Sequence, residues 1–332
     1  MRKNSFSGAL ILLSLLFLFH GAAGAREAAG AQEEAGAAAL GAVRLRVLTW
    51  NVEGGRCGTP RPEVLTTVTS HLKRLKADEG LDVVALQEVF KHQADHIASE
   101  LSFENVHFRH TVDCGDGHTR GNAIVSRYRF EAGSRRYHSF RVQHPEEGEE
   151  RNVIGGSIMV EGRRVYLFST HLTARAENPK TRGPSRSRFC PHGEDSCEAN
   201  FWRAQQAAEA VDFAEGYRPS DRRKQFRALL MGDFNAERNP HIEYVRNAYR
   251  LVTEKYRDAW VISAHNRGWD PGDRRGFTLP TGPYPGPDPS YKRVDYVFLR
   301  KDSGVNVVSA ARLRRTGDAS DHYPVRAVLR FN

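Results

Sequence analysis

The sequence is poor in cysteine and lacks the short motifs of several enzyme classes. It has four cysteines in 332 residues, and none stands in a Cys-x-x-Cys pair, which argues against a zinc finger. It has no Gly-x-Ser-x-Gly motif, the sharp turn that presents the nucleophile of many serine hydrolases. It also lacks internal repeats and any Ser/Gly-rich or Pro-rich stretch long enough to link two domains. These absences favour one large domain that uses neither zinc-finger nor serine-nucleophile chemistry.

The N-terminus has the pattern of an export signal. Arg2 and Lys3 precede an apolar run over 9–19, which ends in the small residues of 21–25. A membrane anchor is the alternative, but this run is shorter than the ~20 residues that span a bilayer. We therefore predict a signal peptide over 1–25 and a secreted or periplasmic protein.

The next segment, 26–42, is rich in Ala, Gly and Glu and contains no aromatic or β-branched residue. Such a composition cannot bury enough apolar surface to offset the entropy of ordering, so we predict a disordered leader. The remaining residues, 43–332, fall within the size range of a single large α/β domain.

The chain is basic, with a formal net charge of +9. The signal contributes two cations and no acid, so the mature chain keeps +7. A positive balance favours polyanionic partners such as nucleic acid or anionic lipid surfaces, although net charge also reports on solubility.

An even number of cysteines in an exported chain predicts disulfides. Cys57, Cys114, Cys190 and Cys197 allow three pairings. We favour Cys190 with Cys197, because the six residues between them can turn back, which leaves Cys57 with Cys114. A zinc site that includes His192 is the weaker alternative, since no second histidine stands at finger spacing.

Strand patterns outnumber helix patterns along the domain. An alternating strand at 44–50, an amphipathic helix at 62–77 and an apolar strand at 81–86 open it. Further strands are predicted at 122–126, 153–160, 165–170, 226–231, 294–299 and 324–331, and a long helix at 198–216. This order predicts a four-layered α/β sandwich, in which two mixed β-sheets pack face to face with helices outside.

Acids and amides stand at the ends of these strands. Asn51 follows the first strand, and Glu88 follows the strand at 81–86. A buried carboxylate is costly unless it is paired or bound to a cation, and Mg²⁺ prefers oxygen ligands of this kind. For Glu88 alone, an acid at the N-terminus of a helix is the commoner alternative.

Two histidines and three acidic or amide side chains complete a possible reaction centre. Asp233 and Asn235 would share one face of an extended segment, where they could orient a water molecule. Taken alone, their Gly-Asp-Phe-Asn sequence is commonly just a turn. His171 and His322 are the candidate acid and base, and Asp295 could orient the His322 ring. A structural role is the alternative for either histidine.

Together these segments resemble the endonuclease/exonuclease/phosphatase superfamily, over the chain from Thr49 to Val325. The resemblance implies the sandwich fold and hydrolysis of phosphate esters. It implies that Asn51, Glu88 and Asp321 hold Mg²⁺, with Mn²⁺ or Ca²⁺ as alternatives.

The resemblance also implies roles around the phosphate. His171 would contact the scissile phosphate, Asp233 and Asn235 would position the attacking water, and Asp295 would support His322. The segment from Arg120 to Asn122 looks like the family's central strand, so both residues could reach the phosphate.

The sequence leaves the substrate open. Nucleic acid is the first hypothesis, because arginines gather in two loop segments. They are Arg182, Arg186, Arg188, Arg274 and Arg275. A sphingomyelinase-type phospholipid substrate would need exposed aromatics such as Trp269 and Tyr284. A phosphatase and a binding module without catalysis are further alternatives; no protein partner is expected, and a monomer is predicted.

Overall fold

The computed structural model describes most of the chain beyond the leader. The described residues are 43–57, 59–115, 117–144, 147–174, 195–221, 224–236, 247–263, 278–280, 291–313 and 319–331. Residues Arg44–Asn332 group into one compact unit. The boundaries of the signal, the leader and the domain stay predictions.

The fold is built on two six-stranded sheets. The first has the order β15-β16-β1-β4-β6-β5 and the second the order β11-β14-β10-β9-β8-β7. The first sheet comprises β1 (Val43–Asn51), β4 (Val83–Phe90), β5 (Asn105–Asp113), β6 (Thr119–Ser126), β15 (Val305–Arg312) and β16 (Val325–Phe331). The second comprises β7 (Arg136–Ser139), β8 (Asn152–Val160), β9 (Arg163–His171), β10 (Ala228–Asp233), β11 (Tyr256–Asp258) and β14 (Asp295–Arg300). Two short hairpins add β2 (Gly55–Arg56) to β3 (Thr59–Pro60), and β12 (Leu279–Pro280) to β13 (Tyr291–Lys292).

Both sheets are mixed. In the first, β1 pairs with β4 in parallel, whereas β4 and β6 are antiparallel. In the second, β9 and β10 are parallel, whereas β10 and β14 are antiparallel. In each parallel pair, β1 with β4 and β9 with β10, both carboxyl ends lie at the same end of the sheet, where polar segments of the sequence begin.

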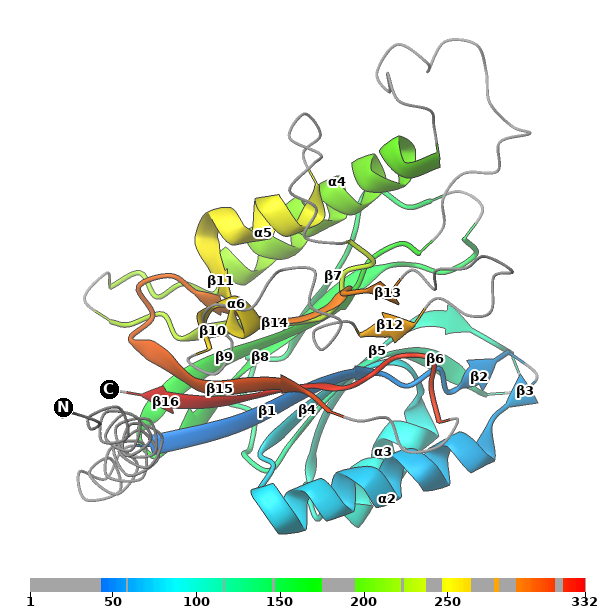
Figure 1. The fold of residues 1–332 in the computed structure, drawn as a ribbon, viewed down its shortest axis with the longest axis horizontal. Coiled ribbons are helices and arrows are strands. Elements are labelled where there is room, and N and C mark those ends of the chain that lie inside the picture. The colour runs from blue at the N-terminus through cyan, green and yellow to red at the C-terminus, as the bar shows by residue number, and fades with distance from the viewer. Residues whose placement is uncertain are drawn as a thin grey trace, which may run out of the picture. The chain divides into compact units, whose positions relative to one another are not determined.

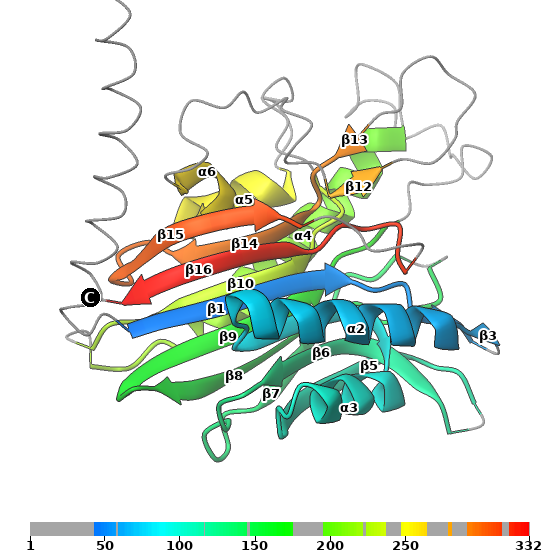
Figure 2. The same ribbon diagram turned by 60° about the horizontal axis from the view of Figure 1, so that its bottom comes forward.

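Helices cover the outer face of each sheet, which completes four layers (Figures 1 and 2). The first sheet is covered by α2 (Pro62–Glu79) and α3 (Lys91–Glu100). The second is covered by α4 (Asp195–Glu215) and α5 (Ala248–Lys255), and the single turn α6 (Ala259–Ile262) follows β11. The predicted sandwich of two mixed sheets with helices outside is confirmed.

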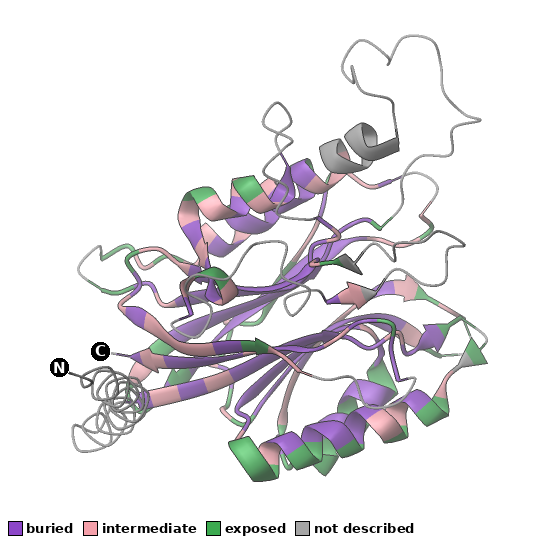
Figure 3. Cartoon of the chain, in the orientation of Figure 1, coloured by how far each residue is buried: buried purple, intermediate pink, exposed green. Residues whose placement is uncertain are grey.

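Hydrophobic periodicity explains how each layer is held. On the first sheet, Leu48 and Trp50 pack against the buried stripe of α2, which includes Val68 and Leu72. On the second, Phe168 packs in a cluster that contains alanines of α4 and aromatic residues of β14. Figure 3 shows the strands largely buried and the outer face of α2 exposed. Because strand residues alternate, the side chains between these positions point into the space between the sheets.

Several predicted boundaries were wrong. The strand predicted to end at Leu86 continues to Phe90, so Glu88 lies inside β4 and not in the first turn of a helix. A register shift between Leu86 and Val89 marks a bulge at this point, and Glu88 takes a φ of 53°. The bulge turns the Glu88 side chain out of the regular alternation of the strand.

Backbone conformation also differs at the Gly-Asp-Phe-Asn segment. Gly232 has a φ of 139°, and a Cβ there would lie 1.9 Å from the carbonyl oxygen of Thr170 on β9. Asn235 has a φ of 46°, so the segment is not extended as predicted. A tight turn brings Asn235 back beside Asp233 instead.

One of the two predicted disulfides lies within the described residues. Cys57 and Cys114 are bonded, and the bond ties the β2–β3 hairpin to the hairpin between β5 and β6. The Cys190–Cys197 pairing lies outside the residues whose side chains are described. No helix in the described parts of the chain is long and apolar enough to cross a membrane.

The Cys57–Cys114 bond closes a loop of 57 residues, so its loss should release considerable unfolded-state entropy. We expect C57S/C114S to lower the free energy of unfolding by about 2–4 kcal/mol. Thermal denaturation with and without reductant measures this. If reductant lowers the Tm of the double variant further, Cys190 and Cys197 also form a stabilising disulfide. An unchanged Tm would contradict a stabilising role for this bond.

Candidate active site

Strand register brings together the polar residues that the sequence singled out. Asp233 at the end of β10 stands opposite His171 in the parallel pair with β9. It also stands opposite Asp295 in the antiparallel pair with β14. In the first sheet, Asn51 pairs with Gln87, one residue before Glu88. Side chains distant in sequence therefore lie at one end of the sandwich.

Asp233 is at the centre of the site and is almost fully buried. Its Oδ2 accepts a hydrogen bond of 3.1 Å from the Asn51 side chain, and its Oδ1 accepts one of 2.8 Å from the backbone N–H of Asn235. The Nε2 atoms of His171 and His322 lie 3.4 and 3.7 Å from Asp233 Oδ2. Burial and the nearby Asp295 raise the pKa of Asp233 to about 7, although His322 opposes the shift.

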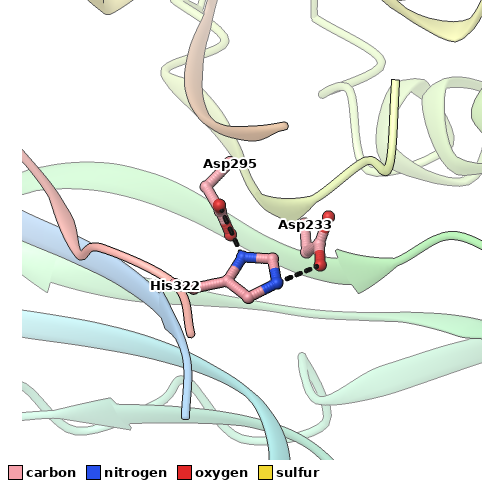
Figure 4. Close-up of side chains that lie close together, drawn as sticks. All are labelled: Asp233, Asp295 and His322. Carbon is pink, nitrogen blue, oxygen red and sulfur yellow. Dashed lines mark hydrogen bonds and ion pairs between the residues drawn. The ribbon is translucent and has the colours of Figure 1, made fainter. Parts of the chain in front are cut away.

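His322 is held between two carboxylates (Figure 4). Its Nδ1 lies 2.8 Å from Asp295 Oδ2, and Asp295 is itself fully buried. Burial alone would disfavour the charged ring. The charges of Asp295 and Asp233 outweigh that cost and raise the pKa of His322 to about 10. His322 is therefore an imidazolium at neutral pH.

The loop that carries His322 is tied to β1. Ser320 Oγ donates to the carbonyl oxygen of Asn51 at 2.7 Å and accepts from the backbone N–H of His322 at 2.9 Å. The indole N–H of Trp50 donates to the carbonyl oxygen of His322 at 3.1 Å. These bonds fix the His322 loop, which leads into β16, to the end of the neighbouring strand β1 in the same sheet.

His171 differs from His322 in its surroundings. It is buried, and among the described residues the carboxylate oxygens near its ring are Asp233 Oδ2, 3.4 Å from Nε2, and Glu88 Oε1, 3.9 Å from Nδ1. Burial, followed by the nearby Arg151 and His322, holds the pKa of His171 well below its usual value. The site thus contains one neutral and one charged histidine on either side of Asp233.

Both carboxylate oxygens of Glu88 accept hydrogen bonds from other side chains of the protein. Its Oε1 accepts from the Asn51 side chain at 3.2 Å, and its Oε2 accepts from Arg120 at 2.8 Å. Arg120 also donates to Glu149 and to the carbonyl oxygen of Gly55. Arg120 therefore lies beside Glu88 and supports it.

The other residue predicted to reach the phosphate lies deeper. Asn122 is fully buried, and its amide donates to the side chain of Asn152 on β8 at 3.1 Å. The phosphate contacts predicted for Arg120 and Asn122 stay predictions.

A sequence profile described as "Endonuclease/Exonuclease/phosphatase family" matches residues 48–322, which span all of these segments. The chain belongs to the endonuclease/exonuclease/phosphatase family. The resemblance predicted from its strand-end motifs is confirmed. A comparison with curated proteins found no match.

Solved structures of this family share the fold. An endonuclease/exonuclease/phosphatase from Beutenbergia cavernae DSM 12333 is 20% identical, with a TM-score of 0.60 over 87% of this chain and 72% of its own. A family protein from Leptotrichia buccalis C-1013-b is 19% identical, with a TM-score of 0.59 over 86% of this chain and 100% of its own. TDP2 from D. rerio, complexed with a single strand DNA product, is 19% identical, with a TM-score of 0.55 over 86% of this chain and 98% of its own.

The family site offers two sets of metal-ligating groups. Asp233, Asp295 and His322 have ligand atoms within 4.8 Å of one another. However, a protonated His322 already supplies a cation between the two carboxylates. The second set is looser and lies near Asn51. Glu88 accepts from the Asn51 amide at 3.2 Å, the backbone N–H of Glu53 donates to the Asn51 side-chain oxygen at 3.2 Å, and the charges of Glu88 and Asp321 act on the Glu53 carboxylate.

The second set fits a hard divalent cation better. Burial raises the pKa of Glu53, and the nearby charges of Asp321 and Glu88 raise it further, against the opposing pull of Arg61. Excess negative charge around a carboxamide is the environment that a bound Mg²⁺ relieves. Asp321 is half exposed, with its Oδ1 3.8 Å from His322 Nε2, so it lies at the rim of the site.

Two residues of the site were missed by sequence reasoning. Glu53 lies two residues beyond Asn51 in the turn after β1, and this spacing could have identified it. Arg151 lies in an acidic, charge-rich stretch that reads as a solvated loop, and no sequence signal singled it out. The arginines of 182–188, Trp269, Arg274, Arg275 and Tyr284 lie outside the described residues.

The raised pKa of Asp233 predicts how pH affects stability. Ionising this buried acid costs folding free energy, so the penalty is absent below pH 3.8 and grows as pH rises to about 7. D233N should remove it, so the Tm of the variant relative to wild type should rise by roughly 5 °C between pH 4 and pH 8.

Calorimetry at the two pH values measures the change. D212N is the control, because Asp212 has a side chain that is 78% exposed. A Tm difference for D233N that is independent of pH would contradict the buried, costly carboxylate.

Proposed function

We propose that this chain is an exported, divalent-metal-dependent phosphodiesterase that hydrolyses nucleic acid. The observation that carries the proposal is the buried Asp233, which lies within 4 Å of two histidines, one neutral and one charged. Family membership supports chemistry on phosphate esters.

The geometry supports direct attack of water on phosphorus. Asp233 accepts the proton of the water, because a carboxylate with a pKa of about 7 is suited to general-base catalysis at neutral pH. Asn235 lies beside Asp233 and helps to orient the water. The imidazolium of His322 stabilises the charge that develops on the phosphoryl oxygens. No residue needs to form a covalent intermediate.

Asn51, Glu88, Asp321 and Glu53 would hold the divalent ion. When bound, the ion supplies charge neutralisation at the phosphate and stabilises the leaving oxygen. Asn51 links the two parts of the site, because its amide contacts both Glu88 and Asp233.

Charge supports a nucleic-acid substrate. Without the predicted signal the chain keeps +7 of its net charge of +9, and counterion release makes a phosphate backbone a favourable partner for such a protein. A structural neighbour, TDP2 from D. rerio, is complexed with a single strand DNA product. Within the described residues, the large exposed apolar side chains are Tyr137, Met159 and Val261. They stand on β7, β8 and α6, whereas Trp269 and Tyr284, the aromatic residues predicted for a phospholipid surface, lie outside the described residues.

Export is supported by the sequence of 1–25 and by the Cys57–Cys114 disulfide. Disulfides persist in oxidising compartments and are rare in the cytosol. A secreted or periplasmic location is therefore part of the proposal.

The substrate class can be tested directly. Purified protein is incubated with plasmid DNA, RNA or sphingomyelin in separate Mg²⁺ reactions, each with and without chelator. We expect cleavage of nucleic acid that chelator abolishes. H322A should lower kcat by about 10³-fold, because a charged group at the phosphate is lost. H96A, a histidine change on the exposed face of α3, is the matched control and should retain full activity.

Each opposing result has a distinct meaning. Hydrolysis of sphingomyelin alone would overturn the nucleic-acid assignment. Activity that survives chelator would contradict the metal. Full activity in H322A would contradict the role of His322 at the phosphate.

The charge of His322 predicts the alkaline limit of activity. Asp295 raises the pKa of His322, so the imidazolium is lost only as pH rises through about 10. D295N should lower that pKa, and the alkaline limb of the kcat/KM profile should move to lower pH. The profile is measured at saturating Mg²⁺ for wild type and variant. An alkaline limb in D295N that coincides with that of wild type would show that His322 does not depend on Asp295.

A further inference from the structure

Arg151 lies behind His171, on the side away from Asp233. It directly precedes β8, and its side chain is 4% exposed. Its Nη1 lies 2.7 Å from His171 Nδ1, and its Nη2 donates to Glu147 at 2.5 Å. Glu147 also accepts from the hydroxyl of Thr173 and from the backbone N–H of Ala174. The guanidinium is therefore fixed to the chain that directly follows His171.

This contact determines where the proton of His171 lies. A guanidinium has donors and no acceptor, so Nδ1 of His171 must accept. A ring that accepts at Nδ1 carries its one proton on Nε2. Arg151 thus makes His171 a neutral ring whose Nε2–H points toward Asp233 and Asn235.

Asn235 presents a second donor at the same point. Its Nδ2 lies 3.0 Å from the carbonyl oxygen of Leu172, which can only accept, so this end of the amide is the NH₂ group. The same nitrogen lies 3.0 Å from His171 Nε2. Two donors therefore face each other, and neither satisfies the other. Asn235 donates to the Leu172 carbonyl oxygen, and Asp233 Oδ2 lies 3.4 Å from His171 Nε2, so a phosphoryl oxygen that enters here would meet a donor from each side chain.

We propose that Arg151 is a positioning residue, which holds His171 in the Nε2–H form so that His171 and Asn235 together donate to one phosphoryl oxygen. The proposal rests on the phosphodiesterase function given above, since that substrate supplies the oxygen. Arg151 does not touch the substrate, and it acts through the ring of His171.

The tautomer can be measured without substrate. Two-bond ¹H–¹⁵N spectra of labelled, metal-free protein distinguish the two neutral forms of each histidine, and H171Q identifies the His171 signals. We expect an Nε2–H ring in wild type and in R151K, which keeps a donor. R151M/E147Q removes the donor without leaving Glu147 ionised and unpaired, and it should populate the Nδ1–H form. An Nδ1–H ring in wild type, or an unchanged tautomer in R151M/E147Q, overturns the proposal.

Kinetics separates positioning from a purely structural role. R151M/E147Q should lower kcat by about tenfold or more while KM stays within about threefold, because the donors act mainly on the transition state. R151K should recover most of the loss, and E147Q alone should lose little. In an H171A background, R151M/E147Q should cause no further loss. An equal loss in that background would show that Arg151 acts independently of His171.

R164M is the matched control, because Arg164 lies at the other end of β9 and pairs with Glu131. It should leave both kinetic constants unchanged. If wild type hydrolyses no phosphodiester, the proposed function fails, and the tautomer measurement alone then decides the role of Arg151.

Discussion

The ion pair between His322 and Asp295 is the interaction on which the rest of the site depends. The register of β10 and β14 places Asp233 and Asp295 directly opposite each other in a buried layer. Two ionised carboxylates at that depth are costly without a cation. The His322 ring supplies the cation from a third segment, 2.8 Å from Asp295. The site can therefore keep Asp233 close to ionisation at neutral pH while the protein stays folded.

The packed sheets also stabilise strained backbone conformations at the site. Of the six non-glycine residues with positive φ in the described part of the chain, three are Glu53, Glu88 and Asn235. Each such residue costs on the order of 1 kcal/mol, and strain of this kind collects at functional sites. The two packed sheets offset it, because the bulge in β4 and the turn after β10 are both anchored by buried neighbours.

The sequence predicted the layered fold and the residues of the site better than it predicted the local backbone conformation at the site. Apolar periodicity identified β1, β9 and β10 because their buried residues form long runs. It missed the end of β4, since the polar pair Gln87 and Glu88 interrupts the apolar pattern inside the strand. Asn235 was correctly grouped with Asp233, but for the wrong reason, because a left-handed backbone and not strand alternation joins them.

Arg151 could not be found by such reasoning at all. The residues before it in the sequence are mostly glutamates, and their composition predicts an exposed, charged loop. Only the folded chain places its guanidinium against His171, because β8 and β9 pair side by side. Pairing between distant segments is set by tertiary packing, which a local pattern does not encode.

His322 is a buried cation held by two carboxylates. A pH titration of the His322 ring nitrogens by ¹⁵N NMR, in metal-free wild-type protein, tests it most directly. Both ring nitrogens should stay protonated through pH 8, and the ring should lose a proton only near pH 10. A ring that titrates near pH 6.5, like an isolated histidine, would show that the two carboxylates do not hold His322 in its charged form.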